Sequence, residues 1–190
     1  MITLGITGGI GCGKTTICKA LSLLDIPLFI SDIEAKKLMT NNSIVRSKLI
    51  AILGEDCYLK NGGLNKPYIS NLIFNNKEIL SQVNNIVHSE THNAFKSWKE
   101  RQKTSIIAYE SALLFESNSN KLVDKVVFIK APLETRIKRV MKRDKISREK
   151  VLDRIKNQMD DSLKEEKSDF IIHNDNDLVI PQILNLINTL

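Results

Sequence analysis

The residues with the clearest chemical meaning lie near the start of the chain, in the stretch TGGIGCGKTT (residues 7–16). Gly8, Gly13, Lys14 and Thr15 match the pattern GxxxxGK[ST], in which a glycine-rich loop binds the phosphates of a nucleoside triphosphate. Glycines are needed because successive backbone N–H groups must turn inward around the phosphates, in conformations that a Cβ atom would obstruct. The spacing therefore predicts a phosphate-binding loop (P-loop) that leads into the N-terminus of a helix.

In such a loop the lysine reaches the β- and γ-phosphates and the following hydroxyl ligates Mg²⁺, so we expect these roles for Lys14 and Thr15. A glycine-rich turn can also join a strand to a helix without any ligand. Here, however, every fixed position is present, between an apolar run at 2–7 and a helical pattern at 14–24. A dinucleotide-binding GxGxxG pattern is excluded, because its third glycine would stand where Lys14 is.

Two acidic residues follow apolar, strand-like runs and are candidates for chemistry. Asp32 comes after the run 26–30, where a carboxylate can accept a proton from an attacking hydroxyl and help to hold the metal; alternatively, it or Ser31 caps the next helix. Glu110 ends the run 105–110 and is a second candidate to support Mg²⁺ through water. His88 and His92 have the i, i+4 spacing of a zinc pair, but the pattern is not HExxH and no third ligand stands out.

A dense basic stretch occupies residues 136–156, with ten Lys and Arg residues. Arg139 and Arg143 are four residues apart and therefore share one face of a predicted helix. Two guanidinium groups on one face, followed by a turn, indicate a lid that closes over polyphosphate. The alternatives are a solvated helix pair, which most charge runs are, and a nucleic-acid patch, for which aromatic platforms are missing.

The elements that must position these residues alternate along the chain. Strand-like runs are expected at 2–7, 26–30, 105–110, 125–130 and 168–174, with helices between them, so the sequence predicts an α/β fold with a five-stranded parallel sheet. The stretch from about 43 to 103 is mainly helical and too long for a simple crossover, so it indicates an insertion. Helical patterns at 133–143 and 147–158 form the expected lid, and a terminal helix is expected over 179–190 despite Pro181.

The composition is that of an ordinary globular protein: 190 residues, 42% hydrophobic and 26% charged. We see no signal peptide and no apolar run long enough to span a membrane, so we expect a cytoplasmic protein. The net charge of +6 suits anionic ligands without choosing among them. Cys12, Cys18 and Cys57 lack CxxC spacing, which fits a reducing compartment. Cys12 reads as a small residue that fits the loop; oxidation of a thiolate at the helix N-terminus is the alternative.

Taken together, these segments resemble the dephospho-coenzyme A kinases over almost the whole chain. GITGGIGCGKTT resembles that family's opening signature, ISDIEAKKL its acidic segment, and GGLNKPYISNLIF its glycine-leucine-asparagine segment. NNIVHSE stands where the family has a His-Pro, and ESALLFES is similar to its acid-Ile-Pro-Leu-Leu-Phe-Glu segment. RVMKRDKISREKVLDRIKNQ resembles its lid, and SDFIIHND its final strand.

The resemblance implies a single P-loop kinase domain over 1–190, with three α/β/α layers. Its core would be 1–34, 104–132 and 160–190, its helical acceptor-binding insertion 35–103, and its lid 133–159. The reaction would be ATP plus dephospho-coenzyme A giving ADP plus coenzyme A, with Mg²⁺ as cofactor, and no nucleic acid, membrane or obligate protein partner is expected. The implied site comprises a catalytic group of Asp32, Lys14, Arg139 and Arg143; an ATP-binding group of Gly11, Cys12, Gly13, Lys14, Thr15, Thr16, Arg143 and Asn174; and an acceptor-binding group of Asp32, Leu64 and His88.

The chain departs from the family pattern at four positions. Ile30 replaces the first of two acids often found before the second helix, Ser89 and Ala112 stand where prolines are usual, and Lys66 stands where an arginine is. These departures concern the geometry of the acceptor pocket more than the reaction. Two rival functions are a P-loop kinase for another small molecule and a nucleotide-dependent switch or nucleic-acid-binding ATPase.

Overall fold

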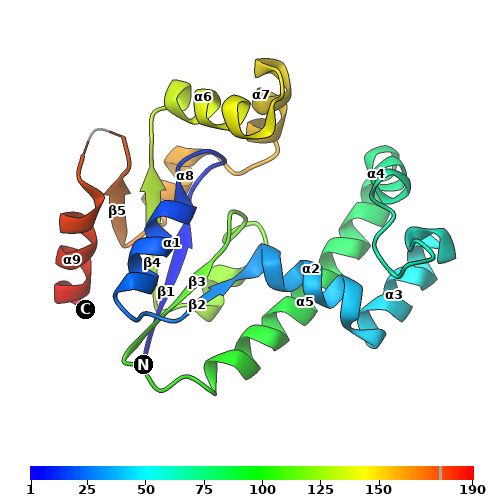
Figure 1. Cartoon of the computed structure of the whole chain (residues 1–190), viewed down its shortest axis with the longest axis horizontal. Coiled ribbons are helices and arrows are strands. Elements are labelled where there is room, and N and C mark those ends of the chain that lie inside the picture. Colours follow the sequence, from blue (N-terminus) through cyan, green and yellow to red (C-terminus); the bar gives the residue numbers. More distant parts are fainter. Residues whose placement is uncertain (176) are drawn as a thin grey trace. The chain divides into compact units, whose positions relative to one another are not determined.

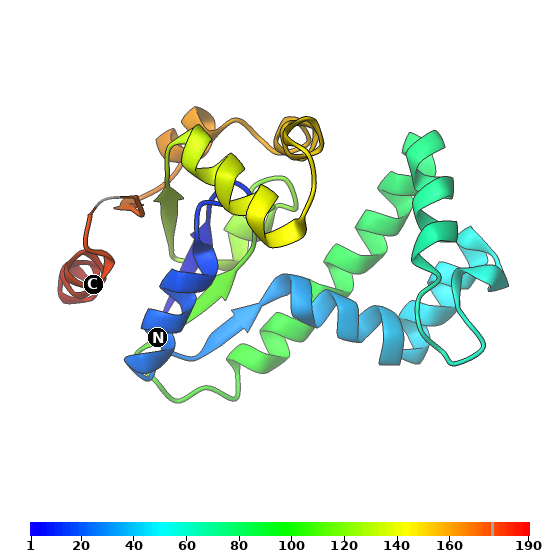
Figure 2. The same cartoon turned by 45° about the horizontal axis from the view of Figure 1, so that its top comes forward.

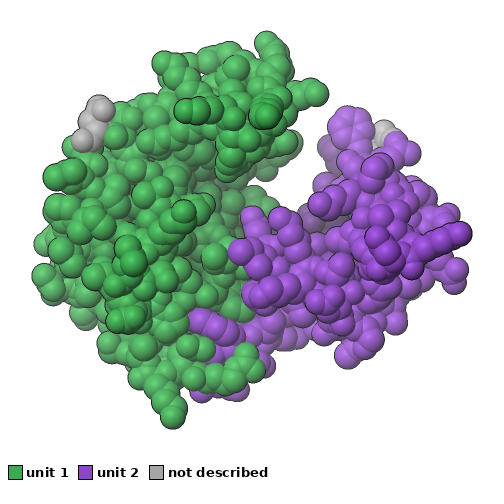
Figure 3. All heavy atoms as spheres, viewed as in Figure 1, with its two compact units in different colours: residues 1–30, 101–190 green, residues 31–100 purple. Residues whose placement is uncertain are grey.

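The computed structural model describes residues 1–175 and 177–190, and the side chains of all of these except Asn75 (Figure 1). The described chain divides into two compact units (Figure 3). Residues 1–30 and 101–190 form one, which we call the sheet unit; residues 31–100 form the other, the helical unit. Each unit has a hydrophobic core of its own.

The sheet unit is built on five parallel strands in the order β2-β3-β1-β4-β5, as the sequence predicts. Their bounds are β1 Ile2–Thr7, β2 Leu28–Ile30, β3 Ile106–Glu110, β4 Lys125–Lys130 and β5 Phe170–His173. The central strands are near-continuous apolar runs because helices cover both faces of the sheet. All five carboxyl ends lie at one edge, so the loops that follow β1, β3, β4 and β5 meet there (Figures 1 and 2).

The helices of the sheet unit are α1 Lys14–Leu23, α6 Leu133–Asp144, α7 Arg148–Lys156, α8 Asp161–Glu166 and α9 Val179–Thr189, with the short 3₁₀ helix η2 at Ser119–Leu122. Helix α9 packs beside α1 and β5. The main core joins these elements through side chains that are almost completely buried, among them Leu4, Ile6, Ile17, Leu21, Val127, Ile129, Ile172 and Ile183. Cys12 and Cys18 belong to the same core.

Helices α6 and α7 also share a small core, which we call the lid core. It consists of Ile137, Val140 and Val151, and partly buried apolar side chains, including Ile10 of the P-loop, pack against it. Figure 2 shows α6 and α7 as two successive helices at the end of the sheet unit where the P-loop lies. The apolar faces of α6 and α7 therefore pack against each other and against Ile10 of the P-loop.

The helical unit contains α2 Ser31–Asn41, α3 Ser43–Leu53, the 3₁₀ helix η1 Glu55–Cys57, α4 Lys66–Asn75 and the long α5 Lys77–Lys99. Helix α5 packs against α2, α3 and α4, and its Val83 joins a core of side chains from α3 and η1: Val45, Leu49, Leu53 and Cys57. Side chains of Asn42, Asn65 and Asn76 cap α3, α4 and α5 by accepting bonds from N–H groups of their first turns. Asn42 and Asn76 are each the single residue between two helices, so their caps allow α3 to follow α2, and α5 to follow α4, almost without a loop.

Several element boundaries differ from those expected. Strand β2 begins at Leu28 rather than residue 26, and Asp169 precedes β5 because its carboxylate accepts bonds from the Val126 N–H and the Lys125 ammonium. Ser31 and Asp32 lie inside the first turn of α2. The six-residue helix α8 is absent from the expectation, because it is too short and too polar to show a period. None of the helices in the described chain combines the length and apolar character needed to cross a bilayer.

Candidate active site

The P-loop joins β1 to α1 in a conformation that depends on glycine. Gly11 and Gly13 have φ angles of 81° and 95°, in the left-handed region that residues with a side chain rarely adopt. A Cβ atom at Gly11 would lie 2.6 Å from the carbonyl oxygen of Arg136, and one at Gly13 would overlap Nδ2 of Asn174. Both the backbone twist and the close neighbours therefore require glycine at these two positions.

Lys14 and Thr15 begin helix α1 directly after this loop. The Lys14 ammonium folds back over the loop and donates to the Gly8 carbonyl oxygen over 2.9 Å. Gly13 is the N-cap residue and has no side chain to cap the helix, so the N–H groups of the first turn are suited to bind an anion. Thr15 and Thr16 are exposed, as groups that meet a ligand from solvent must be.

The carbonyl of Cys12 brings two further predicted residues to the loop. The Asn174 side chain, just beyond β5, donates Nδ2–H to this oxygen over 2.7 Å, and a guanidinium nitrogen of Arg139 in α6 lies 3.4 Å from it. The Cys12 side chain is only 1% exposed and belongs to the main core. Its thiol therefore points into the protein, and its backbone N–H donates to the Gly9 carbonyl oxygen over 3.1 Å within the loop.

Arg143 lies in a different environment from Arg139, although both belong to α6. Its guanidinium pairs with Asp144 over 2.7 Å, and Asp144 also pairs with Arg154 of α7. These two arginines lower the pKa of Asp144 to about 2, with the hydrogen bond from Arg143 as the largest cause. The structure thus places Arg139 beside the P-loop and holds Arg143, which is exposed, in a surface ion-pair cluster.

Glu110 stands at the same edge of the sheet as the P-loop. It ends β3, is 8% exposed, and is in register with Ile6 of β1 on one side and Ile30 of β2 on the other. The next residue, Ser111, donates its N–H to the Ile6 carbonyl oxygen over 3.1 Å. The ends of three neighbouring strands, β1, β2 and β3, are therefore fixed beside one another where the phosphates are expected.

The remaining predicted residues belong to the helical unit. Asp32 is the exposed second residue of α2, two residues after the end of β2. Leu64 forms an isolated bridge with Tyr58, closing a turn that Arg46 supports by lying 3.9 Å from the centroid of the Tyr58 ring and donating to the Gly62 carbonyl oxygen. His88 is half-buried in α5.

Burial lowers the pKa of His88 and of His92, which lies one turn further along α5. Repulsion from His88, when that imidazole is protonated, and from the Lys96 ammonium adds to the effect on His92. Both imidazoles are therefore neutral near pH 7. Within the described part of the chain, no three His, Cys, Asp or Glu residues are grouped so that they would bind a metal ion.

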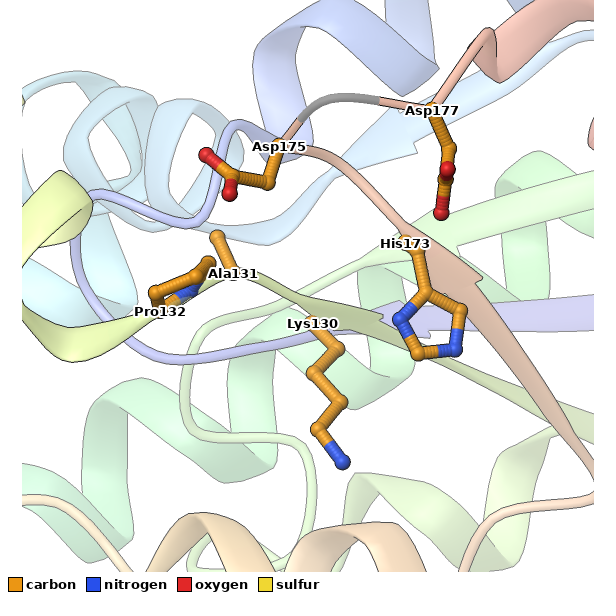
Figure 4. A pocket seen from close by; sticks show the side chains of 6 residues that line it. All are labelled: Lys130, Ala131, Pro132, His173, Asp175 and Asp177. Atoms are coloured by element: carbon orange, nitrogen blue, oxygen red, sulfur yellow. The ribbon is translucent and has the colours of Figure 1, made fainter.

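A pocket of about 280 Å³ opens between the ends of β4 and β5 (Figure 4). Lys130, Ala131 and Pro132 line it from the end of β4, and His173, Asp175 and Asp177 from the end of β5 and the loop that follows. The Thr135 hydroxyl donates to the carboxylate of Asp175 over 3.2 Å, which ties this loop to the first turn of α6. No sequence pattern marks this pocket, because its residues are brought together only by the strand order.

Two buried cations near the P-loop were also missed. Arg136, 3% exposed, belongs to the basic stretch that is otherwise solvated, and it donates to the Ile10 carbonyl oxygen. Lys164 of α8 is completely buried; its ammonium lies 3.1 Å from the Glu116 carboxylate and donates to the Ala112 carbonyl oxygen. Burial lowers the pKa of Lys164, and Glu116 opposes that effect. A run of charges does not show which of its members is buried, so the sequence alone singles out neither residue.

Comparisons with known proteins match this arrangement to one family. The family model for dephospho-CoA kinase matches residues 2–179. A dephospho-CoA kinase of Bacteroides fragilis is 39% identical over 188 residues, which cover 98% of this chain and 91% of that protein.

Two solved structures are similar to this chain over nearly its whole length. A crystal structure of a Thermus thermophilus protein is similar with a TM-score of 0.88 and 28% identity, covering 99% of this chain and 96% of that one. A dephospho-CoA kinase of Campylobacter jejuni is similar with a TM-score of 0.70 and 27% identity, covering 98% and 95%. With the P-loop geometry and a family match over nearly its whole length, the chain belongs to the dephospho-CoA kinase family.

Proposed function

We propose that this protein transfers the γ-phosphoryl group of ATP to the ribose 3′-hydroxyl of dephospho-CoA, giving ADP and CoA in the last step of CoA biosynthesis. The observation that carries the proposal is the family match over residues 2–179. It is supported by the P-loop, in which Gly11 and Gly13 adopt left-handed backbone conformations and lead into the N-terminus of α1. We place the reaction in the cytoplasm, because the spacing of the three cysteines fits a reducing compartment.

ATP binds through its phosphates and its base. The backbone of Gly11, Cys12 and Gly13 faces the phosphates, the Lys14 ammonium leaves the Gly8 carbonyl to neutralise them, and the N–H groups of Thr15 and Thr16 complete the site. The adenosine part occupies the pocket of Figure 4, whose lining residues His173 and Asp175 flank Asn174 in the chain. This assignment is supported by the position of the pocket, which lies at the same sheet edge as the P-loop and next to a residue that contacts it.

The residues at this edge suit Mg²⁺ as a cofactor. The Thr15 hydroxyl and the Glu110 carboxylate, which stand at the start of α1 and the end of β3, are hard oxygen donors of the kind that Mg²⁺ prefers, and Asp32 is a further candidate. When bound with ATP, the ion would neutralise charge on the β- and γ-phosphates. Thr15 would bind it directly, and a carboxylate would bind it through water.

Asp32 accepts the proton of the attacking 3′-hydroxyl, which makes that oxygen a better nucleophile. Its support is its place in the chain, two residues after the end of β2, where the resemblance puts the catalytic base. The insertion at 35–103 binds the acceptor, with Leu64 in the turn closed by Tyr58 and with a neutral His88.

Arg139 and Arg143 of the lid segment (133–159) close over the phosphoryl group in transfer. Closure stabilises its charge and excludes water, so that ATP is not hydrolysed instead. Arg139 already lies by the P-loop, whereas Arg143 must leave Asp144 to take part. The surrounding core is then 1–34, 104–132 and 160–190 of a single kinase domain.

The test is ADP release with a panel of acceptors: dephospho-CoA, a nucleoside monophosphate, shikimate, single-stranded DNA and no acceptor. We expect rapid ADP release only with dephospho-CoA, accompanied by one CoA for each ADP. Equal rates without an acceptor or with DNA would contradict the kinase assignment, and a faster rate with another small molecule would change the substrate.

A further inference from the structure

Ile10, at the tip of the P-loop, is held by the lid segment at three points. Its backbone N–H donates a hydrogen bond to Oε1 of Gln158 over 2.8 Å, and its carbonyl oxygen accepts one from Nε of Arg136 over 2.9 Å. Its side chain packs against the lid core. The lid segment and its C-terminal end thus determine where one whole residue of the phosphate-binding loop lies.

Arg136 provides a rigid support for this part of the loop. It is 3% exposed, and it forms an ion pair with Asp161 at the start of α8. Its guanidinium lies so close to Gly9 that a Cβ atom there would overlap it. A buried guanidinium is stable only where its charge is paired and its donors are used, and Asp161 and Ile10 meet those needs. Arg136 therefore supports the P-loop backbone at Gly9 and Ile10.

Gln158 is fixed at the base of the lid segment, where the chain passes from α7 to α8. Its own N–H donates to the Ile155 carbonyl oxygen over 3.0 Å, which continues the last turn of α7. The next residue, Met159, donates its N–H to the Glu116 carboxylate over 2.8 Å. Gln158 is thus anchored on both sides, and its side chain spans from this anchored turn to the P-loop.

We propose that Gln158 is a positioning residue for the phosphates of ATP, acting by holding the Ile10 N–H so that the loop keeps its binding conformation before the nucleotide arrives. Glycines at positions 8, 9, 11 and 13 leave the loop free to adopt other conformations, which binding would have to suppress. The bond from Ile10 removes part of that freedom in advance, and preorganisation of this kind raises affinity. The inference rests on the proposed use of ATP as phosphoryl donor.

The test compares two replacements of the same residue. Gln158→Met keeps the length of the side chain and removes the acceptor, whereas Gln158→Glu keeps an acceptor oxygen at the same place. Asn157→Ala changes the exposed neighbouring residue and serves as control. We expect Gln158→Met to raise the KM for ATP and the Kd for ADP about tenfold, because the Ile10 N–H loses its partner. The KM for dephospho-CoA stays unchanged, and Asn157→Ala stays within about twofold of the wild type. Gln158→Glu falls between the wild type and Gln158→Met, because it keeps the acceptor oxygen but adds a negative charge near the phosphates.

An unchanged KM for ATP in Gln158→Met would overturn the proposal. So would a rise in the KM values of both substrates with a lower melting temperature, since that pattern marks a purely structural role. Calorimetric binding of ADP separates this proposal from the proposed function. If the wild type did not phosphorylate dephospho-CoA, the kinase assignment would fall, and the Kd for ADP would still report whether Gln158 positions the loop.

Discussion

Single residues at the P-loop show how closely its backbone and its neighbours fit together. Gly13→Ala introduces a side chain at a φ of 95°, and its Cβ atom would displace Asn174 from the Cys12 carbonyl. We expect the KM for ATP to rise at least about tenfold, because the substitution moves both the P-loop backbone and the side chain of Asn174. Steady-state kinetics with varied ATP measure the change.

Gly62→Ala is the matched control for this substitution. Gly62 has a similar φ of 82°, and a Cβ atom there would meet nothing within 4 Å. It should lower the free energy of unfolding by about 1 kcal/mol from backbone strain alone and leave the KM for ATP unchanged. Equal effects of the two variants on that KM would show that the close neighbours of Gly13 do not matter.

Asp32 carries the most direct prediction about the chemical step. Asp32→Asn removes the proton acceptor while keeping the shape of the side chain, so kcat should fall by about 10²–10⁴-fold. The Kd for ATP, measured by calorimetry, should remain close to that of the wild type. Glu34→Gln alters another acid of the same first turn, one that pairs with Lys37, and should leave kcat nearly unchanged. A normal kcat in Asp32→Asn would remove Asp32 from its proposed role.

At the scale of an element, the half-buried histidines of helix α5 make the free energy of unfolding depend on pH. Because the folded protein lowers the pKa of His88 and His92, it binds fewer protons than the unfolded chain at pH values below the ordinary value of 6.5. The stability that these neutral imidazoles provide is complete above that value. It is lost as the pH falls through 6.5 toward the lower, folded pKa values.

Urea unfolding followed by circular dichroism at about pH 7.5 and about pH 5 measures this loss. His88→Gln and His92→Gln together should flatten the dependence, while the double variant keeps polar side chains in both places. Asn185→Gln, at an exposed position of the sheet unit, is the control and should leave the slope as it is. An unchanged slope in the α5 variant would assign the pH dependence to other groups.

The same scale shows what sequence patterns can and cannot supply. The long α5 was predictable because its apolar residues repeat with the period of a helix, and the strands β1 and β4 were predictable because each is a short, nearly continuous apolar run. Helix α8 escaped prediction because its stability comes from Asp160 at its N-cap and from the buried Lys164, neither of which produces a period. Helix α2 begins at Ser31, and only the backbone shows that Asp32 follows inside the helix.

For the whole molecule, the sequence predicted the parallel α/β sheet and the phosphate-binding loop, since motif and strand runs are local features of the chain. The sequence did not predict the hydrogen bond between Ile10 and Gln158, because the two residues are 148 positions apart and meet only in the complete fold. The sequence also did not distinguish Arg136 from the nine other basic residues of its stretch, because its burial depends on contacts with distant segments. Tertiary contacts decide which member of a charged run becomes buried, and a period or motif does not record them.

The burial of the three cysteines has a practical consequence. Cys12 and Cys18 are 1% and 4% exposed within the sheet unit, and Cys57 is 0% exposed within the helical unit. Burial raises the pKa of Cys18 to about 12 and also raises that of Cys57, so these thiols are slow to react with alkylating reagents while the protein is folded. Each modification site therefore reports the transient opening of its own unit. Mass spectrometry of timed labelling would read the local opening rates of the two units separately, without any added probe.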